Sequence, residues 1–161
     1  MLSLKSVEYS VGEFKLKADF KIPRLSKVAL IGPSGAGKST LLSLISGFLK
    51  PNLGSIIIDN EDVTTKLSNQ RRVTTIFQDG NLFPHLTVKK NISLGLRPDL
   101  RLNSAQQSVL DYAIDRVGLT DLVDRKPGSL SGGQQSRVSL ARALVRDCPL
   151  LLLDEPFSAL G

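Results

Sequence analysis

A glycine-rich loop near the N-terminus carries the residue types that bind phosphate. It matches the pattern G-x-x-x-x-G-K-[ST] at Gly32, Gly37, Lys38 and Ser39. Glycines let the backbone turn tightly so that successive N–H groups point at an anion, and a following helix adds the positive end of its dipole. Lys38 is expected to reach the β- and γ-phosphates, and the Ser39 hydroxyl to hold Mg²⁺. A flexible glycine–serine loop is the alternative, but a position between a predicted strand and a predicted helix favours nucleotide binding. The expected nucleotide-binding residues are Gly32, Pro33, Ser34, Gly35, Ala36, Gly37, Lys38, Ser39 and Thr40.

Two carboxylates follow the last apolar run of the chain. Residues 150–153 are four leucines, and Asp154 and Glu155 come directly after them. A buried strand that ends in Asp can place that carboxylate beside a phosphate loop, where it helps to hold Mg²⁺. The adjacent Glu can then orient or deprotonate an attacking water. Taken alone, the segment fits a strand that runs into an acidic turn; together with the phosphate loop, it favours a catalytic role.

A pair of glycines precedes a predicted helix later in the chain. Leu130 is followed by Ser131, Gly132, Gly133 and Gln134. Ser131 with Gln134 fits a capping box, and the glycines expose backbone amides at the helix end. The segment is either an ordinary capped helix after a loop or a second anion site that faces a γ-phosphate. The expected apolar face of this helix consists of Val138, Ala141 and Val145.

The elements that must position these residues alternate between strand and helix patterns. Short aliphatic or β-branched runs predict strands at residues 28–31, 55–58, 73–77 and 150–153. The continuous runs at 28–31 and 150–153 indicate burial on both faces, as in a parallel sheet covered by helices. A mostly helical stretch at about 86–130 interrupts the alternation. The pattern therefore predicts an α/β sheet domain with an inserted helical subdomain.

Two helices are predicted from apolar residues at helical spacing. The first carries Leu41, Leu44, Ile45 and Phe48, and the stop signals Gly47 and Pro51 follow. The second carries Leu110, Ala113, Ile114 and Val117. Ser104 with Gln107 is the expected capping box of this second helix, and Gly118 its terminator.

Composition excludes several other classes of protein. The chain has 161 residues, of which 41% are hydrophobic and 22% charged, as in an ordinary soluble globular domain. The 13 glycines, 8 prolines and single cysteine exclude collagen-like, low-complexity and disulfide-rich chains. No apolar run approaches the roughly 20 residues of a membrane-spanning helix, and the N-terminus lacks the apolar stretch of a secretory signal. The lone Cys148 is compatible with a reducing cytosol. The net charge of +6 favours anionic ligands or surfaces, but the basic residues are scattered and do not select a function.

Together the motifs resemble those of the ATP-binding subunits of ABC transporters. The resemblance covers nearly the whole chain and implies a P-loop NTPase fold of the ABC ATPase type, in a single domain over residues 1–161 with a helical subdomain at about 86–130. It also implies ATP hydrolysis, with Mg²⁺ held by Ser39, Gln78 and Asp154 and with Glu155 and Gln78 as catalytic residues. The matching segments are Gly32 to Ser39 (Walker A), Gln78 (Q-loop), Leu130 to Gln134 (signature motif), Leu150 to Asp154 (Walker B) and Glu155 (catalytic glutamate).

The same resemblance implies partners. Two such subunits pack head to tail, so that Ser131 and Gly133 of one contact the γ-phosphate that Lys38 of the other holds. ATP binding then closes the dimer, and hydrolysis with release reopens it. The signature residues expected to act in trans are Ser131, Gly132, Gly133 and Gln134. The resemblance also implies that the chain binds transmembrane permease subunits, and that it acts through them with a periplasmic binding protein. It implies no binding of nucleic acid. The implied location is the cytoplasmic face of the bacterial inner membrane.

The segment after the Q-loop is similar to that of importer ATPases. Residues 81–88 resemble the stretch that borders the groove for a coupling helix of the membrane subunit. Two alternatives have equal weight for the apolar residues of this stretch: each lines that groove or belongs to the hydrophobic core. These residues are Phe83, Leu86 and Val88. The sequences of residues 47–51, 78–83 and 91–96 resemble those of the ATPases of bacterial thiamine importers. The ATPases of polyamine, ferric-iron, sulfate and molybdate importers share most of these motifs.

Some positions depart from the family pattern. Tyr9 is the nearest candidate for the aromatic residue that stacks on adenine, but Val11 stands where the ring is expected. Ordinary strand packing is therefore the alternative for Tyr9. Gly161 replaces the closing Asp of the D-loop, and Ser136 stands where Gln is usual.

The family's switch histidine follows a further strand beyond Walker B, whereas this sequence stops at Gly161. The only histidine, His85, is expected to cap or pack the region beside the coupling groove. By family topology, that further strand lies between the Walker A and Walker B strands. We therefore expect a C-terminally truncated, poorly stable form, in which two aliphatic strands lose a common neighbour and expose backbone groups.

Three functions are compatible with these observations. The first is an ATPase subunit that drives solute import. The second is a truncated module that holds nucleotide without turnover. The third is a non-transport ABC ATPase acting on DNA or ribosomes, which the single ATPase unit and the importer-like residues 82–86 disfavour.

Overall fold

The computed structural model describes residues 1–77 and 81–154. The chain divides into two compact units. The first comprises Met1–Val73 and Cys148–Leu152. The second comprises Thr74–Asp147 together with Leu153 and Asp154. Gln78, Glu155 and Gly161, which the sequence singled out, lie outside the described residues.

The first unit contains an antiparallel sheet of four strands. The strands are β1 (Leu2–Val11), β2 (Phe14–Ile22), β3 (Leu53–Ile58) and β4 (Glu61–Asp62), in the order β2-β1-β3-β4. Along β2, exposed and half-buried side chains alternate, because successive residues of a strand point to opposite faces. The prediction of a strand at residues 55–58 is confirmed by β3.

A bulge bends β1 between Leu4 and Val7. Ser6 has a φ of 47°, and its N–H and hydroxyl both donate to Oδ2 of Asp19, at 2.9 and 3.1 Å. Gly54 lies opposite with a φ of 84°, and a Cβ there would sit 2.2 Å from the carbonyl oxygen of Ser6. Glycine is therefore required where the two backbones come closest.

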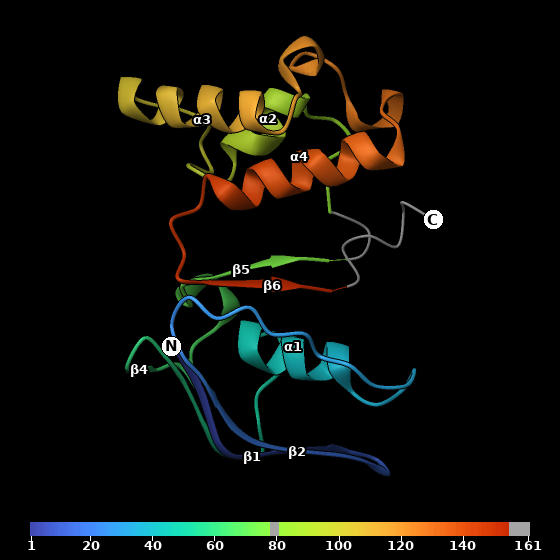
Figure 1. Ribbon diagram of the computed structural model, residues 1–161, viewed down its shortest axis with the longest axis vertical. Helices are drawn as coiled ribbons and strands as arrows, with labels where there is room; N and C mark the ends of the chain where they lie inside the picture. Colours follow the sequence, from blue (N-terminus) through green and yellow to red (C-terminus); the bar gives the residue numbers. More distant parts are fainter. Residues whose placement is uncertain (78–80, 155–161) are drawn as a thin grey trace. The chain divides into compact units, whose positions relative to one another are not determined.

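Helix α1 (Lys38–Ser46) packs on the inner face of this sheet. Figure 1 shows the helix, in cyan, above the dark-blue strands. Gly47 ends it in the left-handed conformation, with a φ of 85°, as the stop signal predicted. The prediction of Phe48 on the buried face is wrong, because the helix ends before it and the ring is 56% exposed. The buried core of the unit consists of Leu2, Leu4, Val7, Leu41, Leu44, Ile45, Ile56, Ile58, Val63, Val73 and Leu152.

Residues 28–31 do not form a strand, so this prediction is wrong. Val28 is 63% exposed and Ile31 90% exposed. A strand needs a neighbour to satisfy its N–H and C=O groups, and no strand of the described ranges pairs with this segment. The aliphatic pattern alone was therefore insufficient to predict a strand.

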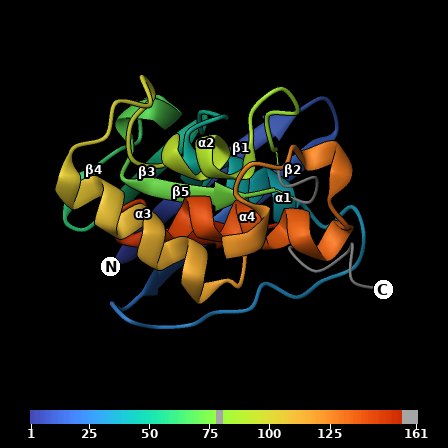
Figure 2. The same cartoon turned by 90° about the horizontal axis from the view of Figure 1, so that it is seen from above.

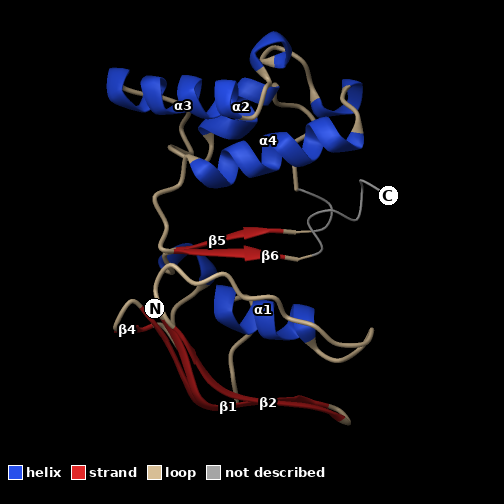
Figure 3. Cartoon of the chain, viewed as in Figure 1, coloured by secondary structure: helices blue, strands red, loops and turns tan. Residues whose placement is uncertain are grey.

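Strands β5 (Val73–Ile76) and β6 (Leu150–Leu153) form a second sheet of two strands. Figure 3 shows their arrows pointing in the same direction, as expected of parallel strands. Both were predicted, although β5 ends one residue before the predicted limit of 77. In β6 only Leu152 is buried, whereas Leu151 and Leu153 are each 43% exposed. The expected burial of this run on both faces is therefore wrong.

The described residues of the second unit form three α-helices around a core of their own. They are α2 (Val88–Ser93), α3 (Ser104–Arg116) and α4 (Gly132–Leu144), and Figure 2 shows them gathered together. The expected apolar face of α4 is confirmed, since Val138, Ala141 and Val145 are all buried. Short 3₁₀ turns at Thr120–Leu122 and Pro127–Ser129 connect α3 to α4. The buried core consists of Val88, Ile92, Leu110, Ala113, Ile114, Leu119, Leu130, Val138, Ala141 and Val145.

The start of α3 differs from the prediction. Asn103, not Ser104, is the N-cap: its side chain accepts a hydrogen bond from the Gln106 N–H at 2.9 Å, while Oε1 of Gln106 accepts from the Asn103 N–H at 3.1 Å. The capping box is thus shifted by one residue, because Asn caps as well as Ser. Gly118, with a φ of 65°, follows the helix as predicted. None of the helices in the described ranges is long and apolar enough to cross a bilayer.

Candidate functional site

The glycine-rich loop lies between β2 and α1 in the first unit. Figure 3 shows the whole connection between these two elements as loop. Gly35 and Gly37 have φ values of 79° and 88°, which favour glycine. A Cβ at Gly37 would also lie 2.9 Å from Cζ of Phe14 and 3.1 Å from Cδ1 of Leu16. The left-handed backbone conformation therefore favours glycine here, and the ring of Phe14 lies close beside it.

Lys38, the first residue of α1, directs its ammonium back across the loop. Nζ donates to the carbonyl oxygens of Gly32 and Pro33, at 2.9 and 2.8 Å. Both acceptors are neutral, and an anionic phosphate oxygen is a stronger partner for an ammonium group. The side chain is thus placed where a phosphate on the loop can take it over.

The N-terminus of α1 presents backbone amides to the same loop. The first N–H groups of a helix have no partner within it, and the N-cap, Gly37, provides no side chain to bond them. The first turn contains no acidic residue. A phosphate therefore fits the positive end of the helix dipole without competition from a carboxylate.

The residues expected to bind nucleotide are accessible to solvent. Residues 32–36 and Ser39 are exposed, whereas Gly37, Lys38 and Thr40 are half-buried.

The residues expected to hold Mg²⁺ are divided between the two units. Ser39 belongs to the first unit and Asp154 to the second, where the Asp154 N–H donates to the Ile76 carbonyl oxygen at 2.9 Å. Across residues 1–77 and 81–154 no three His, Cys, Asp or Glu side chains cluster as a metal site. Mg²⁺ commonly takes one or two protein ligands and completes its shell with waters and phosphates. Ser39 and Asp154 carry oxygen ligands of the type that Mg²⁺ prefers, and their role as its ligands stays a prediction.

Tyr9 lies in β1, half-buried, and packs against the core of the first unit. This packing is what the strand-packing alternative expects, and stacking of the ring on adenine stays a prediction. Phe14, which the sequence analysis did not single out, lies against the phosphate loop at Gly37. The alternation of apolar and charged residues from Phe14 to Ile22 was the signal that could have placed it on the inner face of a strand.

The signature segment begins α4. The Ser131 hydroxyl accepts from the Gln134 N–H at 3.3 Å, and Oε1 of Gln134 accepts from the Ser131 N–H at 2.9 Å. The predicted capping box is therefore confirmed. Gly132 and Gly133 form the first turn of the helix, which contains no acidic residue. Gln135 adds a support that the sequence did not suggest, because its Nε2 donates to the carbonyl oxygens of Pro127 and Leu130 at 3.1 and 3.3 Å.

Asn91, in α2, organises the loop at residues 83–87. Its side chain is fully buried, and Oδ1 accepts from the Phe83 N–H at 2.9 Å. Nδ2 donates to the carbonyl oxygens of Phe83, Leu86 and Thr87, each at 3.1 Å. One side chain thus satisfies both ends of a short turn.

The loop displays aromatic residues beside a cavity of about 370 Å³ in the second unit. Phe83 is 46% exposed and lines the cavity, Leu86 is half-buried, and Val88 is buried in the core. The groove assignment therefore suits Phe83, and the core assignment suits Val88. The ring of His85 packs edge-on against that of Phe83, with centroids 6.0 Å apart.

Two arginines bring positive charge to this cavity. Arg142 and Arg146 both line it, and Nη1 of Arg142 donates to the Asn81 carbonyl oxygen at 2.9 Å. Burial, and to a lesser extent the charge of Arg146, lowers the pKa of Arg142. The cavity is therefore suited to a partner that combines apolar surface with an acidic group.

Comparisons with known sequences show strong similarity over nearly the whole chain. Residues 16–158 match the family model described as ABC transporter. The chain is 51% identical over 160 residues to the thiamine import ATP-binding protein ThiQ of Shigella sonnei (strain Ss046), which covers 99% of this chain and 69% of that protein. ThiQ of Yersinia pestis is also 51% identical over 160 residues, with coverage of 99% and 68%.

Solved structures have the same fold. The ATP-binding cassette MJ0796, in a dimeric post-hydrolysis state bound to ADP and Pi, matches with a TM-score of 0.83 and 33% identity, over 100% of this chain and 76% of that chain. The cassette MJ1267 matches with a TM-score of 0.86 and 27% identity, over 98% and 69%. The predicted α/β fold of the P-loop NTPase class is confirmed. With its phosphate loop, its capped signature helix and these similarities, the chain belongs to the ABC transporter family as an ATP-binding cassette.

Proposed function

We propose that this chain is the ATP-hydrolysing subunit that drives the import of thiamine or thiamine phosphates through an ABC importer. The observation that carries the proposal is the phosphate loop: Lys38 lies across two loop carbonyls, and α1 presents uncapped amides beside it. The cargo is inferred from the 51% identity to ThiQ proteins. ATPases of polyamine, iron or oxyanion importers share these motifs and are the alternatives for the cargo.

In this proposal the residues of one chain hold the triphosphate and begin the reaction. The amides of residues 35–39 and the ammonium of Lys38 bind the β- and γ-phosphates. Ser39, Gln78 and Asp154 would hold Mg²⁺, which neutralises charge on the phosphate oxygens when it is bound. The Glu155 carboxylate accepts a proton from the attacking water, whose oxygen bonds to the γ-phosphorus as the bond to ADP breaks.

A second copy of the chain would complete each site. Its Ser131, Gly132, Gly133 and Gln134 contact the γ-phosphate at the start of α4. The capping box supports this role, because it fixes the first turn of α4 while the glycines leave its amides uncovered. Nucleotide would then favour the closed dimer, since that state alone binds ATP from both sides.

The cavity in the second unit would receive a segment of the transmembrane permease. Its exposed Phe83 and its two arginines fit a helix with an apolar face and an acidic residue. This contact would place the chain at the cytoplasmic face of the bacterial inner membrane. A periplasmic binding protein would take part only through the permease.

Phosphate release in the presence of Mg²⁺ and ATP tests the catalytic part of the proposal. Glu155→Gln should lower turnover by about 10²-fold or more while ATP binding is retained, because only the proton acceptor is lost. Lys38→Ala should weaken binding itself. If Glu155→Gln hydrolyses ATP as fast as the unchanged chain, the assignment of the base is wrong.

Transport tests the cargo. Vesicles that contain the permease, the binding protein and this chain should take up labelled thiamine with ATP inside. Spermidine, ferric iron and sulfate are the matched competitors, and preferential uptake of any of these would assign a different importer.

Nucleotide binding without turnover is the second candidate. It is favoured by the segment just before the phosphate loop, where Val28, Leu30 and Ile31 are exposed rather than packed in a sheet. Binding of Mg-ATP with no phosphate release, in the presence of the permease, would select this function.

A further inference from the structure

Arg71 is the only charged residue among the buried side chains of the described ranges, and it is 3% exposed. It follows a 3₁₀ turn at Ser68–Gln70 and precedes β5. The next residue, Arg72, is exposed. A buried guanidinium is costly unless its N–H groups are satisfied, so its partners indicate what it does.

Four hydrogen bonds join the guanidinium to backbone carbonyl oxygens of the first unit. Nη1 donates to Leu44 at 2.7 Å and to Ile45 at 2.8 Å. Nε donates to Lys66 at 2.9 Å, and Nη2 donates to Thr64 at 3.2 Å. Arg71 therefore ties the last turn of α1 to residues 64–66.

The end of α1 is built to receive this group. The last carbonyls of a helix have no partner within it and carry the negative end of the dipole, and α1 has no basic residue of its own in its last turn. A Cβ at Gly47 would lie 2.5 Å from Nε and 2.9 Å from Cζ of Arg71. Glycine thus both ends the helix and leaves room for the guanidinium.

The other end of the same short helix carries the phosphate-binding residues. Helix α1 has 9 residues, and Lys38 and Ser39 are its first two. A helix moves largely as a rigid rod, so a constraint on its last turn also fixes the position of its first turn. A displacement of about 1 Å in a binding group can cost 10²-fold in rate.

We propose that Arg71 is a positioning residue for nucleotide binding, which sets the place of Lys38 and Ser39 by holding the C-terminal end of α1. The inference rests on the proposed nucleotide-binding function. Burial lowers the pKa of Arg71, in agreement with a guanidinium whose partners are carbonyls rather than a carboxylate.

The test compares ATP affinity and thermal stability in matched variants of the chain. Arg71→Met should weaken the binding of a fluorescent ATP analogue by about 10-fold or more. Arg71→Lys keeps the positive charge but not the planar guanidinium with its several N–H donors, so its loss of affinity should be intermediate. Lys50→Met removes an exposed positive charge from the same unit and should change neither the ATP affinity nor the melting temperature. Gly54→Ala, at the β1 bulge away from α1, should lower the melting temperature but leave the affinity of the folded molecules unchanged.

A purely structural role predicts a different result. The proposal is overturned if Arg71→Met and Arg71→Lys lower the melting temperature as Gly54→Ala does while ATP affinity stays within about twofold. If Arg71→Met does not fold, Arg71→Lys alone is compared with Gly54→Ala in melting temperature and ATP affinity.

Hydrogen exchange without nucleotide separates this inference from the proposed function. Arg71→Lys should reduce the protection of the amides of residues 42–46 selectively, whereas Gly54→Ala should not. If Arg71→Lys loses that protection but the unchanged chain binds no ATP, the proposed function is contradicted, whereas the constraint of Arg71 on α1 is supported. Unchanged protection of α1 in Arg71→Lys would overturn the constraint itself.

Discussion

At the scale of single residues, two side chains organise backbone segments that carry no regular structure of their own. Asn91 satisfies four backbone groups of the loop at residues 83–87. Asp59 joins the β3–β4 turn to the segment after β2 and to the N-terminus. Each makes its contacts through more than one atom, so substitution has several consequences at once.

Replacement of Asn91 should destabilise the second unit. Asn91→Leu keeps the volume but removes the acceptor of the Phe83 N–H and the donor to the Leu86 carbonyl oxygen, whereas the carbonyl oxygens of Phe83 and Thr87 each keep a backbone partner. We expect a loss of about 2–4 kcal/mol in the free energy of unfolding, measured with urea. Ser108→Ala, on the exposed side of α3, is the control and should change it by less than about 0.5 kcal/mol. A loss as small as that of the control would show that the loop does not depend on Asn91.

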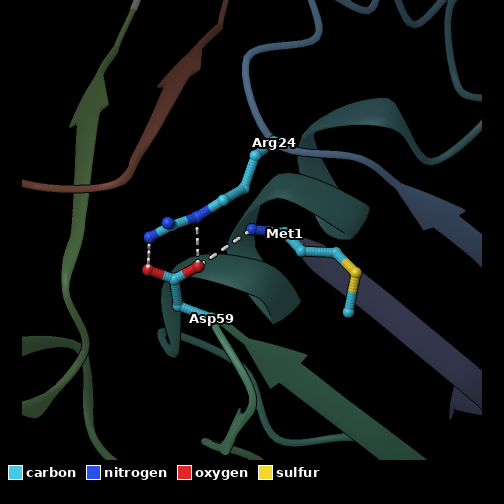
Figure 4. A network of polar contacts seen from close by, with 3 residues as sticks. All are labelled: Met1, Arg24 and Asp59. Carbon is cyan, nitrogen blue, oxygen red and sulfur yellow. Dashed lines mark hydrogen bonds and ion pairs between the residues drawn. The ribbon is translucent and has the colours of Figure 1, made fainter.

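The network around Asp59 predicts a dependence on pH. Figure 4 shows the carboxylate between Arg24 and the amino group of Met1: Nε of Arg24 donates at 2.9 Å, Nη2 at 2.5 Å and the N-terminal nitrogen at 3.1 Å. These partners, Arg24 first, lower the pKa of Asp59. A carboxyl whose pKa is lower in the folded state stabilises that state at neutral pH and loses this contribution as the pH falls.

The measurement is the difference in urea midpoint between the unchanged chain and Asp59→Asn. The difference should be constant from pH 7 to pH 5 and should shrink below about pH 4, where an ordinary aspartate is protonated. Asp19→Asn is a less suitable comparison because Asp19 supports the β1 bulge, whereas the exposed Asp111→Asn is a suitable control. A difference that grows as the pH falls would contradict the assignment.

At the scale of elements, the sequence predicted best where a pattern and its end signals agreed. Helix α1 was predicted with its glycine terminator, and α4 with its capping box. The segment at 28–31 failed because its pairing depends on a distant neighbour, which a local pattern does not contain. Strands β1 and β2 were not predicted, although β2 alternates clearly. Similarly, neither the contacts of Arg71 nor those of Asn91 could be predicted, because both depend on segments brought together by folding.

The shifted cap of α3 gives a test at this scale. Asn103→Ala should cost about 1 kcal/mol of unfolding free energy, because it removes the acceptor for the Gln106 N–H. Ser104→Ala, at the position that the sequence had suggested as the cap, should be nearly neutral. Chemical denaturation of the two variants under the same conditions decides between them, and a larger loss for Ser104→Ala would restore the original prediction.

At the scale of the whole molecule, the residues of the proposed site are shared between two compact units. The phosphate loop and α1 belong to the first, whereas α4 and the cavity with Arg142 belong to the second. In the proposed dimer, the phosphate loop of the first unit holds one nucleotide, while the start of α4, in the second unit, contacts the nucleotide of the partner. ATP would therefore couple two copies, and the permease contact would lie on the unit that contacts the partner's nucleotide.

The exposed aliphatic segment before the phosphate loop predicts how the whole chain behaves in solution. Ile31 is 90% exposed, whereas Ile56, in β3, is fully buried. Ile31→Thr should leave the free energy of unfolding within about 0.5 kcal/mol, while Ile56→Thr should cost about 2–4 kcal/mol by the loss of buried methylene and the burial of a hydroxyl. Light scattering should also show less self-association for Ile31→Thr, because an exposed aliphatic segment with unpaired backbone groups recruits other chains. If Ile31→Thr were as destabilising as Ile56→Thr, residues 28–31 would have to be packed in solution, and their exposure could not favour a module that binds nucleotide without turnover.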